Sequence, residues 1–185
     1  VSSTGIAGYI SGTANLAAGG VSAGGSVLLR VNTTPGAINE SISVNGQELV
    51  IRFSADEGNL FAISVSDLSI NIGDVLSLEG SVSFVDGVTI RAKDIRDASP
   101  ADKDVVVQTV AANGVSIFFG GGPLTLSGGD RNPLARGFLL TDASIALLKF
   151  GDGTYALDAV GTIEVVGIAG VNIAGTVRTR FNNSN

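Results

Sequence analysis

The stretch VSAGGSV at residues 21–27 returns as VNIAGTV at residues 171–177, 150 positions further along the chain. Both copies alternate apolar or small residues with polar ones, and both place a glycine before a hydroxyl residue and a valine. A third copy, LSLEGSV, occupies residues 76–82. Repetition inside a chain is the signature of repeat architectures. It favours a structural module over a catalyst.

The first and last copies of the pattern also share their surroundings. A Gly-Thr pair precedes each copy, at residues 12–13 and 161–162. An Arg-apolar-Asn run follows each copy, at residues 30–32 and 180–182. The end of the chain thus resumes the pattern of its start, as expected of one period cut from a longer array.

Length and composition fit one folded module. Hydrophobic residues make up 44% of the 185 residues, while glycine supplies 26 residues and charged residues only 15%. We interpret residues 1–185 as a single β-rich module that holds about one 150-residue period plus an overlap, with a subdivision into 1–97 and 104–185 as the alternative. The net charge of −6 argues against a nucleic-acid partner, which requires clustered Lys and Arg. No apolar run has the length of a membrane-spanning helix.

Alternation with a period of two dominates the chain. From Thr154 to Val165, apolar residues or glycine fill the odd positions and polar residues fill most of the even ones. This pattern is typical of antiparallel strands with one buried face. Turn signals at hairpin spacing, such as Asn45-Gly46 and Asp152-Gly153, separate about a dozen strands. The sequence therefore predicts an all-β antiparallel meander that forms a β-sandwich or jelly-roll-like module, with a β-solenoid as the alternative.

One expected strand changes phase. Apolar residues fall on odd positions in 61–65 and on even positions in 68–72, so the slip lies at Ser66-Asp67. Because a one-residue slip moves later side chains to the opposite face, we expect a β-bulge or a strand that passes into a second sheet. Both alternatives favour a sandwich or a sharply coiled sheet over one flat layer.

Two further breaks are expected between strands. Asp86-Gly87 is interpreted as a turn that divides residues 75–96 into two strands. A second break, at residue 113, divides residues 104–119 in the same way.

Glycine recurs at one place of the repeated pattern. Gly25, Gly80 and Gly175 fall on the apolar side of their strands, where the lack of a side chain permits close backbone approach or a sharp bend. We therefore predict that Gly175→Val disturbs the packing more than Thr176→Val.

The two ends of the period carry the same polar residues. Arg30 and Asn32 correspond to Arg180 and Asn182. We expect the arginines, with Arg178, to pair with carboxylates on a neighbouring strand or to protect a sheet edge. Asn32 and Asn182 each begin an Asn-x-Ser/Thr triplet, which we interpret as a chance occurrence of the N-glycosylation pattern.

The longest stretch of turn chemistry lies between Gly120 and Gly137. The favoured interpretation is a plain connection between two parts of the sheet. The alternative is an interface or binding loop, because long loops in compact domains are often functional. The residues that would carry it are Gly120, Pro123, Arg131 and Pro133.

The sequence offers few residues for catalysis or for holding a cofactor. The chain has no Cys and no His, which removes the commonest general base and the usual ligands of structural zinc. Paired carboxylates could run glycoside hydrolysis, so a hydrolase stays as a remote alternative. The acidic residues are nevertheless spread over turns and strand faces. We expect no enzyme activity and no organic cofactor.

Calcium is the ligand that the acidic turns best fit. It takes about six to eight oxygen ligands, which carboxylates and Asn side chains supply. The candidates are Asp102 and Asp104 in one connection, and Asp130 with Asn132 in the long loop. Neither group has EF-hand spacing. The favoured interpretation is that these residues cap turns and keep an apolar chain soluble.

The C-terminal repeat resembles a known class of protein. The run from Asp152 to Gly161, followed by residues 171–178, is similar to the tandem modules of very large secreted bacterial surface proteins of the adhesin type. Residues 25–35 belong to the same pattern. The resemblance covers about a third of the chain. It implies an extracellular, structural or adhesive role, in some cases with calcium. The G-G-x-G-x-D nonapeptide of calcium-binding secreted repeats is missing, and Gly128-Gly129-Asp130 is only a fragment of it.

These observations define the expected function. We expect a structural building block of a bacterial cell-surface protein or fibre, which associates head-to-tail or in tandem with further copies of itself. The alternative is a calcium-dependent adhesive module that binds a cell-surface glycan or protein. A nucleic-acid partner and a membrane span are not expected.

Overall fold

The computed structural model describes residues 5–92 and 103–184. The elements, in chain order, are β1(Ala7–Ala18), β2(Val21–Asn32), β3(Ile38–Val44), β4(Gln47–Phe53), the 3-10 helix η1(Ala55–Glu57), β5(Leu60–Ile72), β6(Leu76–Ala92), β7(Lys103–Gly121), β8(Arg136–Phe150), β9(Tyr155–Val166) and β10(Ala174–Asn182). The expectation of an all-β antiparallel chain is confirmed. Within the described ranges no helix is long and apolar enough to cross a membrane.

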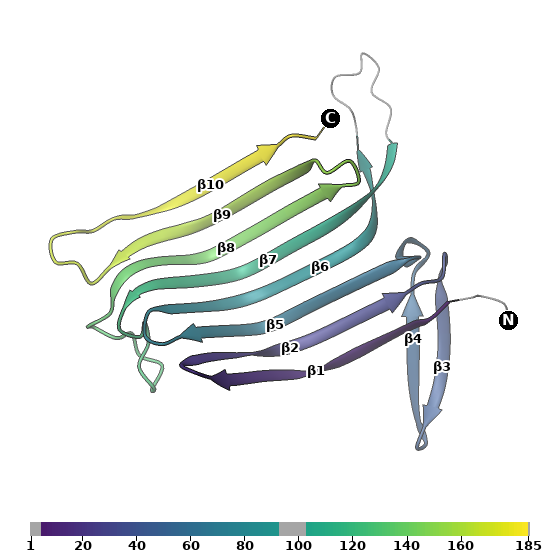
Figure 1. Ribbon diagram of the computed structural model, residues 1–185, viewed down its shortest axis with the longest axis horizontal. Coiled ribbons are helices and arrows are strands. Elements are labelled where there is room, and N and C mark those ends of the chain that lie inside the picture. Colours follow the sequence, from purple (N-terminus) through teal and green to yellow (C-terminus); the bar gives the residue numbers. More distant parts are fainter. Residues whose placement is uncertain (1–4, 93–102, 185) are drawn as a thin grey trace, which may run out of the picture.

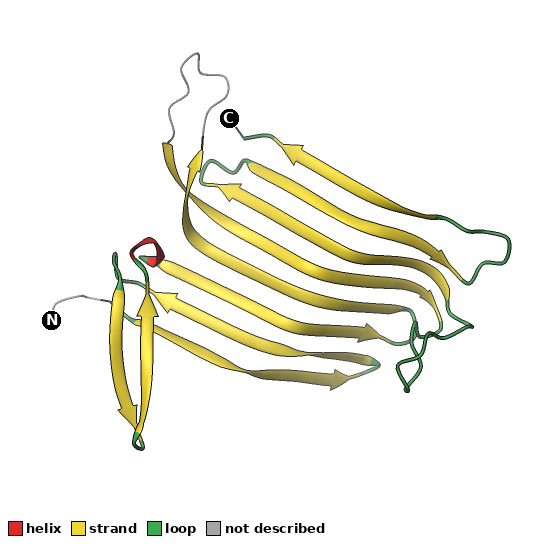
Figure 2. Cartoon of the chain, turned by 180° about the vertical axis from the view of Figure 1, so that it is seen from behind, coloured by secondary structure: helices red, strands yellow, loops and turns green. Residues whose placement is uncertain are grey.

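Eight strands form one meander sheet in the order β1-β2-β5-β6-β7-β8-β9-β10. The β3–β4 hairpin is a separate two-stranded sheet. It projects from the end of the large sheet, across the direction of β1 (Figures 1 and 2). One sheet therefore runs across the subdivision considered between residues 97 and 104, because β6 pairs with β7.

Within residues 5–92 and 103–184 the strands are fewer and longer than expected. The interpretation of Asp86-Gly87 as a turn was wrong, because β6 continues through it with a register shift between Val85 and Val88. The break at residue 113 was wrong for the same reason, because β7 runs on with a shift between Ala112 and Val115. Both sites are bulges inside long strands rather than hairpin turns.

A row of bulges crosses the sheet from strand to strand. The slip at Ser66-Asp67 is confirmed as a β-bulge between Val65 and Leu68, and Asp67 has a φ of 52°. The row continues through the register shifts of β6 and β7 and reaches β8, where Asp142 has a φ of 51°. Each bulge inserts one residue and thereby restores the phase of the alternation. Apolar residues before and after the slip thus lie on the same side of one sheet.

The cross-strand registers place most large apolar side chains of the sheet on one side, called here the apolar face. It includes Ile10, Leu16, Val27, Leu29, Phe61, Ile63, Val65, Ile70, Val82, Phe84, Val110, Ile117, Phe119, Phe138, Leu140, Ile145, Leu147, Leu157, Ile163, Val177 and Phe181.

The described residues contain no second layer over the apolar face. Phe119 and Phe138 are 58% and 59% exposed there, and Phe181 is 46% exposed. The expected sandwich is therefore absent from this part of the chain, and neither a closed barrel nor a solenoid is seen. Alternation correctly showed that each strand has one apolar side. It carries no information on what covers that side.

Burial is concentrated where loops fold back on the opposite side of the sheet. Nine hydrophobic residues among those described are buried. Four of them, Phe118, Ala135, Leu139 and Val166, form one cluster with the half-buried Leu124. Leu124 and Ala135 belong to the loop between β7 and β8, so this loop supplies part of the core.

Candidate interaction sites at the two ends of the sheet

The first and last hairpins of the sheet are equivalent. In β1–β2, Gly12 pairs with Val27. In β9–β10, Gly161 pairs with Val177. Positions in β1 and β9 differ by 149, positions in β2 and β10 differ by 150, and this correspondence holds along both ladders. β2 and β10 also run in the same direction, from left to right in Figure 1. The repeated pattern therefore marks a repeated structure.

The equivalence extends to the hydrogen bonds that close the two hairpins. Thr33 donates its N–H to the carbonyl of Ile6 over 2.8 Å, and Asn183 donates to the carbonyl of Tyr155 over 3.1 Å. In return, the N–H of Ile6 donates to Thr33 Oγ1 over 2.8 Å. The N–H of Tyr155 donates to Asn183 Oδ1 over 2.7 Å. Different side chains thus make the same bond at corresponding positions.

The two Asn-x-Ser/Thr triplets fold in the same way. Asn32 Oδ1 accepts from the N–H of Thr34 over 3.0 Å and from its hydroxyl over 2.7 Å. Asn182 Oδ1 accepts from the N–H of Ser184 over 2.9 Å and from its hydroxyl over 2.6 Å. Side chains of Asn commonly bond the backbone two residues on in this way. The triplets have a structural role here, which the interpretation as chance glycosylation patterns missed.

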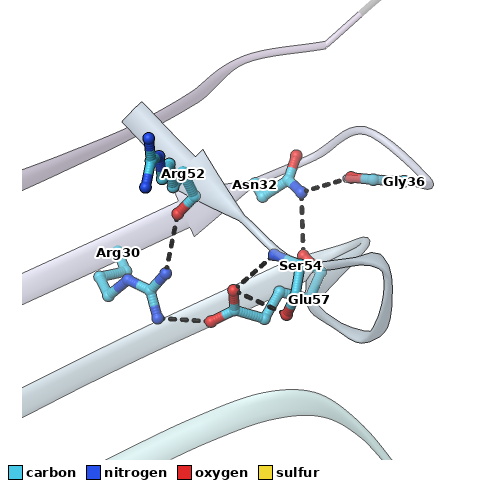
Figure 3. Close-up of polar contacts among 6 residues, drawn as sticks. All are labelled: Arg30, Asn32, Gly36, Arg52, Ser54 and Glu57. Atoms are coloured by element: carbon cyan, nitrogen blue, oxygen red, sulfur yellow. Dashed lines mark hydrogen bonds and ion pairs between the residues drawn. The ribbon is translucent and has the colours of Figure 1, made fainter. Parts of the chain in front are cut away.

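At the end of β2, four residues build what we call the junction cluster: Arg30, Asn32, Ser54 and Glu57 (Figure 3). Arg30 Nη1 donates to Glu57 Oε1 over 2.5 Å, and its Nη2 donates to the carbonyl of Arg52 over 3.2 Å. Asn32 Nδ2 donates to the carbonyl of Gly36 over 3.1 Å and to that of Glu57 over 2.9 Å. The cluster joins β2 to the β3–β4 hairpin and to the entry of β5.

The electrostatics of the junction cluster centre on Glu57. Its Oε2 accepts from the N–H of Ser54 over 2.8 Å and from the Ser54 hydroxyl over 3.0 Å. The hydrogen bond from Arg30 holds the pKa of Glu57 below its usual value, against the smaller opposing effect of burial. The guanidinium of Arg30 also lies over the ring of Phe53, 4.8 Å from its centroid. A cation in this position is attracted by the face of the ring.

At the end of the chain, β10 presents the corresponding arginine and asparagine. Arg178 forms a two-pronged contact with Asp158 on β9, with Nε to Oδ1 at 2.9 Å and Nη2 to Oδ2 at 2.5 Å. The expected pairing with a carboxylate on the neighbouring strand is confirmed for this residue. Arg180 lies 3.4 Å from the same Asp158, and its side chain is 72% exposed. The hydrogen bond from Arg178 lowers the pKa of Asp158.

The three pattern glycines meet different surroundings. A Cβ on Gly25 would lie 2.8 Å from Val65 Cγ1 and 3.2 Å from the carbonyl oxygen of Ser66, at the bulge of β5. Gly80 has a φ of 145° beside Val115 of β7. A Cβ on Gly175 would meet nothing within 4 Å. The prediction that Gly175→Val disturbs the packing therefore has no basis within this chain.

The two groups of residues proposed for calcium belong to different parts of the chain, and most of β7 lies between Asp104 of the first group and Asp130 of the second. Asp102 lies outside the described residues. Asp104 is at the start of β7 beside Arg91, and Asp130 is in the loop after the far end of β7. Asn132 is buried, and its side-chain amide bonds within the loop. Its Nδ2 donates to the carbonyl of Pro123 over 2.8 Å, and its Oδ1 accepts from the N–H of Leu134 over 3.0 Å. No group of three or more Asp, Glu, His or Cys that could hold a metal occurs in the described ranges, so the calcium site stays a prediction.

The loop candidates take part in closing and anchoring the loop. Gly120 pairs with Gly137 in the β7–β8 ladder, where a Cβ would clash with the carbonyl oxygen of Arg136. Arg131 forms a bridge with Thr125 and an ion pair with Glu164 at 3.2 Å. Pro123 offers its carbonyl to Asn132, and Pro133 is exposed. These contacts leave the role of the loop in binding a prediction.

Sequence reasoning missed Glu57, Ser54 and the role of the two asparagines. A signal was present, because Ser54 and Glu57 have the Ser-x-x-Glu spacing of a capping box. Comparison with protein-family models, with curated proteins and with solved structures found no match for this chain.

Proposed function

We propose that this chain is a non-catalytic structural module, in which one period of a tandem repeat adds strands to a continuing sheet. The observation that carries the proposal is the equivalence of the first and last hairpins, in register and in closing hydrogen bonds. The period then consists of β1, β2, β5, β6, β7 and β8 with the β3–β4 hairpin, and β9–β10 begins the next period. The resemblance to bacterial surface modules supports an extracellular site of action.

The edges of the sheet fit this arrangement. Among the described strands, β1 has a partner on one side only, and so does β10. Within the chain, β8 pairs with β9, the counterpart of β1. Likewise β5 pairs with β2, the counterpart of β10. The β8–β9 pairing is thus a template for a neighbour of β1, and the β5–β2 pairing is a template for a neighbour of β10. Because strand edges are templates for pairing, both edges would be satisfied in an array.

The apolar face supplies a second surface for association. A compact protein of 18.6 kDa exposes roughly 8,200 Å², whereas this chain exposes 12036 Å². The difference exceeds the roughly 800 Å² per partner that a standard interface buries. The proposal therefore includes face-to-face contact between the apolar faces of two copies. The sandwich expected from the sequence would then form between modules rather than within one.

A chain with two periods in phase tests the proposed function. Residues 1–184 are followed directly by residues 35–185, because Ser184 corresponds to Thr34. We expect one cooperative unfolding transition in urea, with a larger m-value than the single module because more surface is exposed on unfolding. The matched control joins two copies of 1–185 through a flexible Gly-Ser linker, which breaks the phase.

The control chain should unfold at the midpoint of the single module. If the phased chain also unfolds at that midpoint with the m-value of the linker chain, its periods do not share a sheet and the proposal is wrong. Localisation is tested separately, by surface labelling of intact bacteria that produce the protein.

A further inference from the structure

We infer that β10 is an acceptor edge for one particular strand, the counterpart of β5 from a second copy of the repeat. In the same inference, Arg180 and Asn182 are half of a second junction cluster, whose other half comes with that strand. The inference rests on the proposed function and gives it a partner, a register and a set of contacts.

The first argument comes from the polar side chains. Asn32 uses its oxygen to close the turn and its amide to hold Gly36 and Glu57. Asn182 makes the same turn with its oxygen. The segment that its amide would hold is the counterpart of residues 36–57, which in phase would come directly after residue 185. Asn32 is 0% exposed, whereas Asn182 is exposed.

Arg180 likewise makes fewer contacts than its counterpart Arg30. Arg30 bonds the carboxylate of Glu57 and lies over Phe53. Arg180 has a 3.4 Å contact with Asp158, which Arg178 already holds with two shorter bonds. Its largely exposed guanidinium is therefore available to a further carboxylate. Exposed pairs of this kind contribute little, whereas a carboxylate from a Ser-x-x-Glu turn would be fixed by the turn itself.

The second, independent argument is Gly175. At its counterpart Gly25, a Cβ would lie closer than van der Waals contact to the bulge of β5, at 2.8 Å from Val65 Cγ1 and 3.2 Å from the carbonyl oxygen of Ser66. Gly175 faces open space in this chain. A strand with the bulge of β5, paired with β10, would use that space. Glycine at 175 is thus explained by a neighbour that this chain alone does not supply.

The β2–β5 ladder predicts the register of the incoming strand. Leu29 pairs with Ile63 in the chain, so Thr179 should pair with Ile63 of the second copy. Val27 pairs with Val65, so Val177 should pair with Val65 of the second copy. The partner is therefore an extended segment that alternates apolar and Ser residues, carries a bulge and follows a Ser-x-x-Glu turn.

Cysteine cross-linking on an extended version of the 185-residue chain tests this register, and the chain has no native Cys to interfere. Residues 35–74 are appended after Ser184, which supplies the β3–β4 hairpin, η1 and β5 of the next period. T179C is combined with I63C in the appended copy. The shifted control combines T179C with V65C in the appended copy, and the benchmark is L29C with I63C in the original part.

We expect the in-register pair to oxidise to the same extent as the benchmark, because directly opposed residues have Cα atoms about 4.5–5.5 Å apart, a distance that a disulfide can bridge. The shifted pair should oxidise at least tenfold more slowly. In addition, hydrogen exchange at the β10 amides that face away from β9 should slow at least tenfold on extension. E57Q in the appended copy should reverse a large part of this protection.

Three results would overturn the inference: faster oxidation of the shifted pair, no oxidation of either pair, or unchanged exchange in β10. They are distinguishable from a failure of the proposed function. If the phased two-period chain still unfolds as one unit while the register test fails, modules share a sheet through another pairing. If both tests fail, the tandem-sheet proposal itself is wrong.

Discussion

Truncation of Asn32 to alanine, with the same truncation at Asn182 as its matched control, separates the two equivalent sites. The substitutions delete the same atoms from corresponding positions of β2 and β10. They differ in what those atoms touch. Asn32 makes four side-chain hydrogen bonds while fully buried. Asn182 makes two, both to Ser184, and is exposed.

The contacts set the expected magnitudes. Each hydrogen bond contributes about 1 kcal/mol net, and a buried group left unsatisfied costs about 1–3 kcal/mol. Asn32→Ala removes four bonds, so we expect a loss of about 3–5 kcal/mol in the free energy of unfolding. Asn182→Ala should lose about 1 kcal/mol or less, because water replaces both bonds at an exposed site. The difference, about 3 kcal/mol, is the contribution of the junction cluster through Asn32.

Urea unfolding followed by circular dichroism measures both values. With an m-value of about 1–3 kcal/mol/M, the midpoint of Asn32→Ala should fall below that of Asn182→Ala by about 1–3 M at unchanged m. Equal midpoints for the two variants would refute the reasoning, because the junction cluster would then contribute nothing beyond the turn that both sites share.

Three further predictions follow from the same structure. Because the pKa of Glu57 is lowered in the fold, its contribution is complete above about pH 4.3 and is lost as the pH falls through the lower folded value. The stability difference between wild type and Glu57→Gln, from urea melts, should therefore shrink between about pH 5 and pH 3, and a constant difference would contradict this. Gly25→Val should lower the thermal midpoint strongly because of its contact with Val65, while Gly175→Val should leave it nearly unchanged, and equal shifts would argue against the bulge as the cause. Analytical ultracentrifugation should show concentration-dependent self-association that Phe119→Lys, on the exposed apolar face near the end of β7, weakens without changing the circular dichroism spectrum, so a monomer at all concentrations would rule out face-to-face contact.

The fold class followed from the sequence, whereas the number of strands and layers did not. Alternation shows which side of each strand is apolar, and the slip at Ser66-Asp67 located a bulge correctly. Asp86-Gly87 and Gly114 were harder to interpret, because the positive φ that these residues permit serves a hairpin turn and a bulge equally well. Only the neighbouring strand distinguishes the two cases, since it either ends or continues past the site.

Only part of the candidate site could be predicted from the sequence. The correspondence of Arg30 with Arg180 and of Gly25 with Gly175 could be found by comparing the chain with itself. The partner of Arg30 could not, because Glu57 lies 27 positions away, on the far side of the β3–β4 hairpin in the chain. The calcium prediction had the opposite weakness. Its two groups, Asp102 with Asp104 and Asp130 with Asn132, were chosen because their members are close in sequence, which does not determine whether their oxygens converge on one point.

The number of strands in the period has a consequence for any array that it builds. The order β1-β2-β5-β6-β7-β8 contains six strands before β9 repeats β1, and six is even. In an extended sheet, every β3–β4 hairpin would therefore project from the same side, at the same ends of the strands. With strands about 4.8 Å apart, successive hairpins, six strands apart, would lie about 29 Å from one another along the fibre axis. The right-handed twist of the strands would rotate each hairpin relative to the previous one, so that the hairpins follow a spiral. A multivalent partner would then meet these hairpins at regular angles.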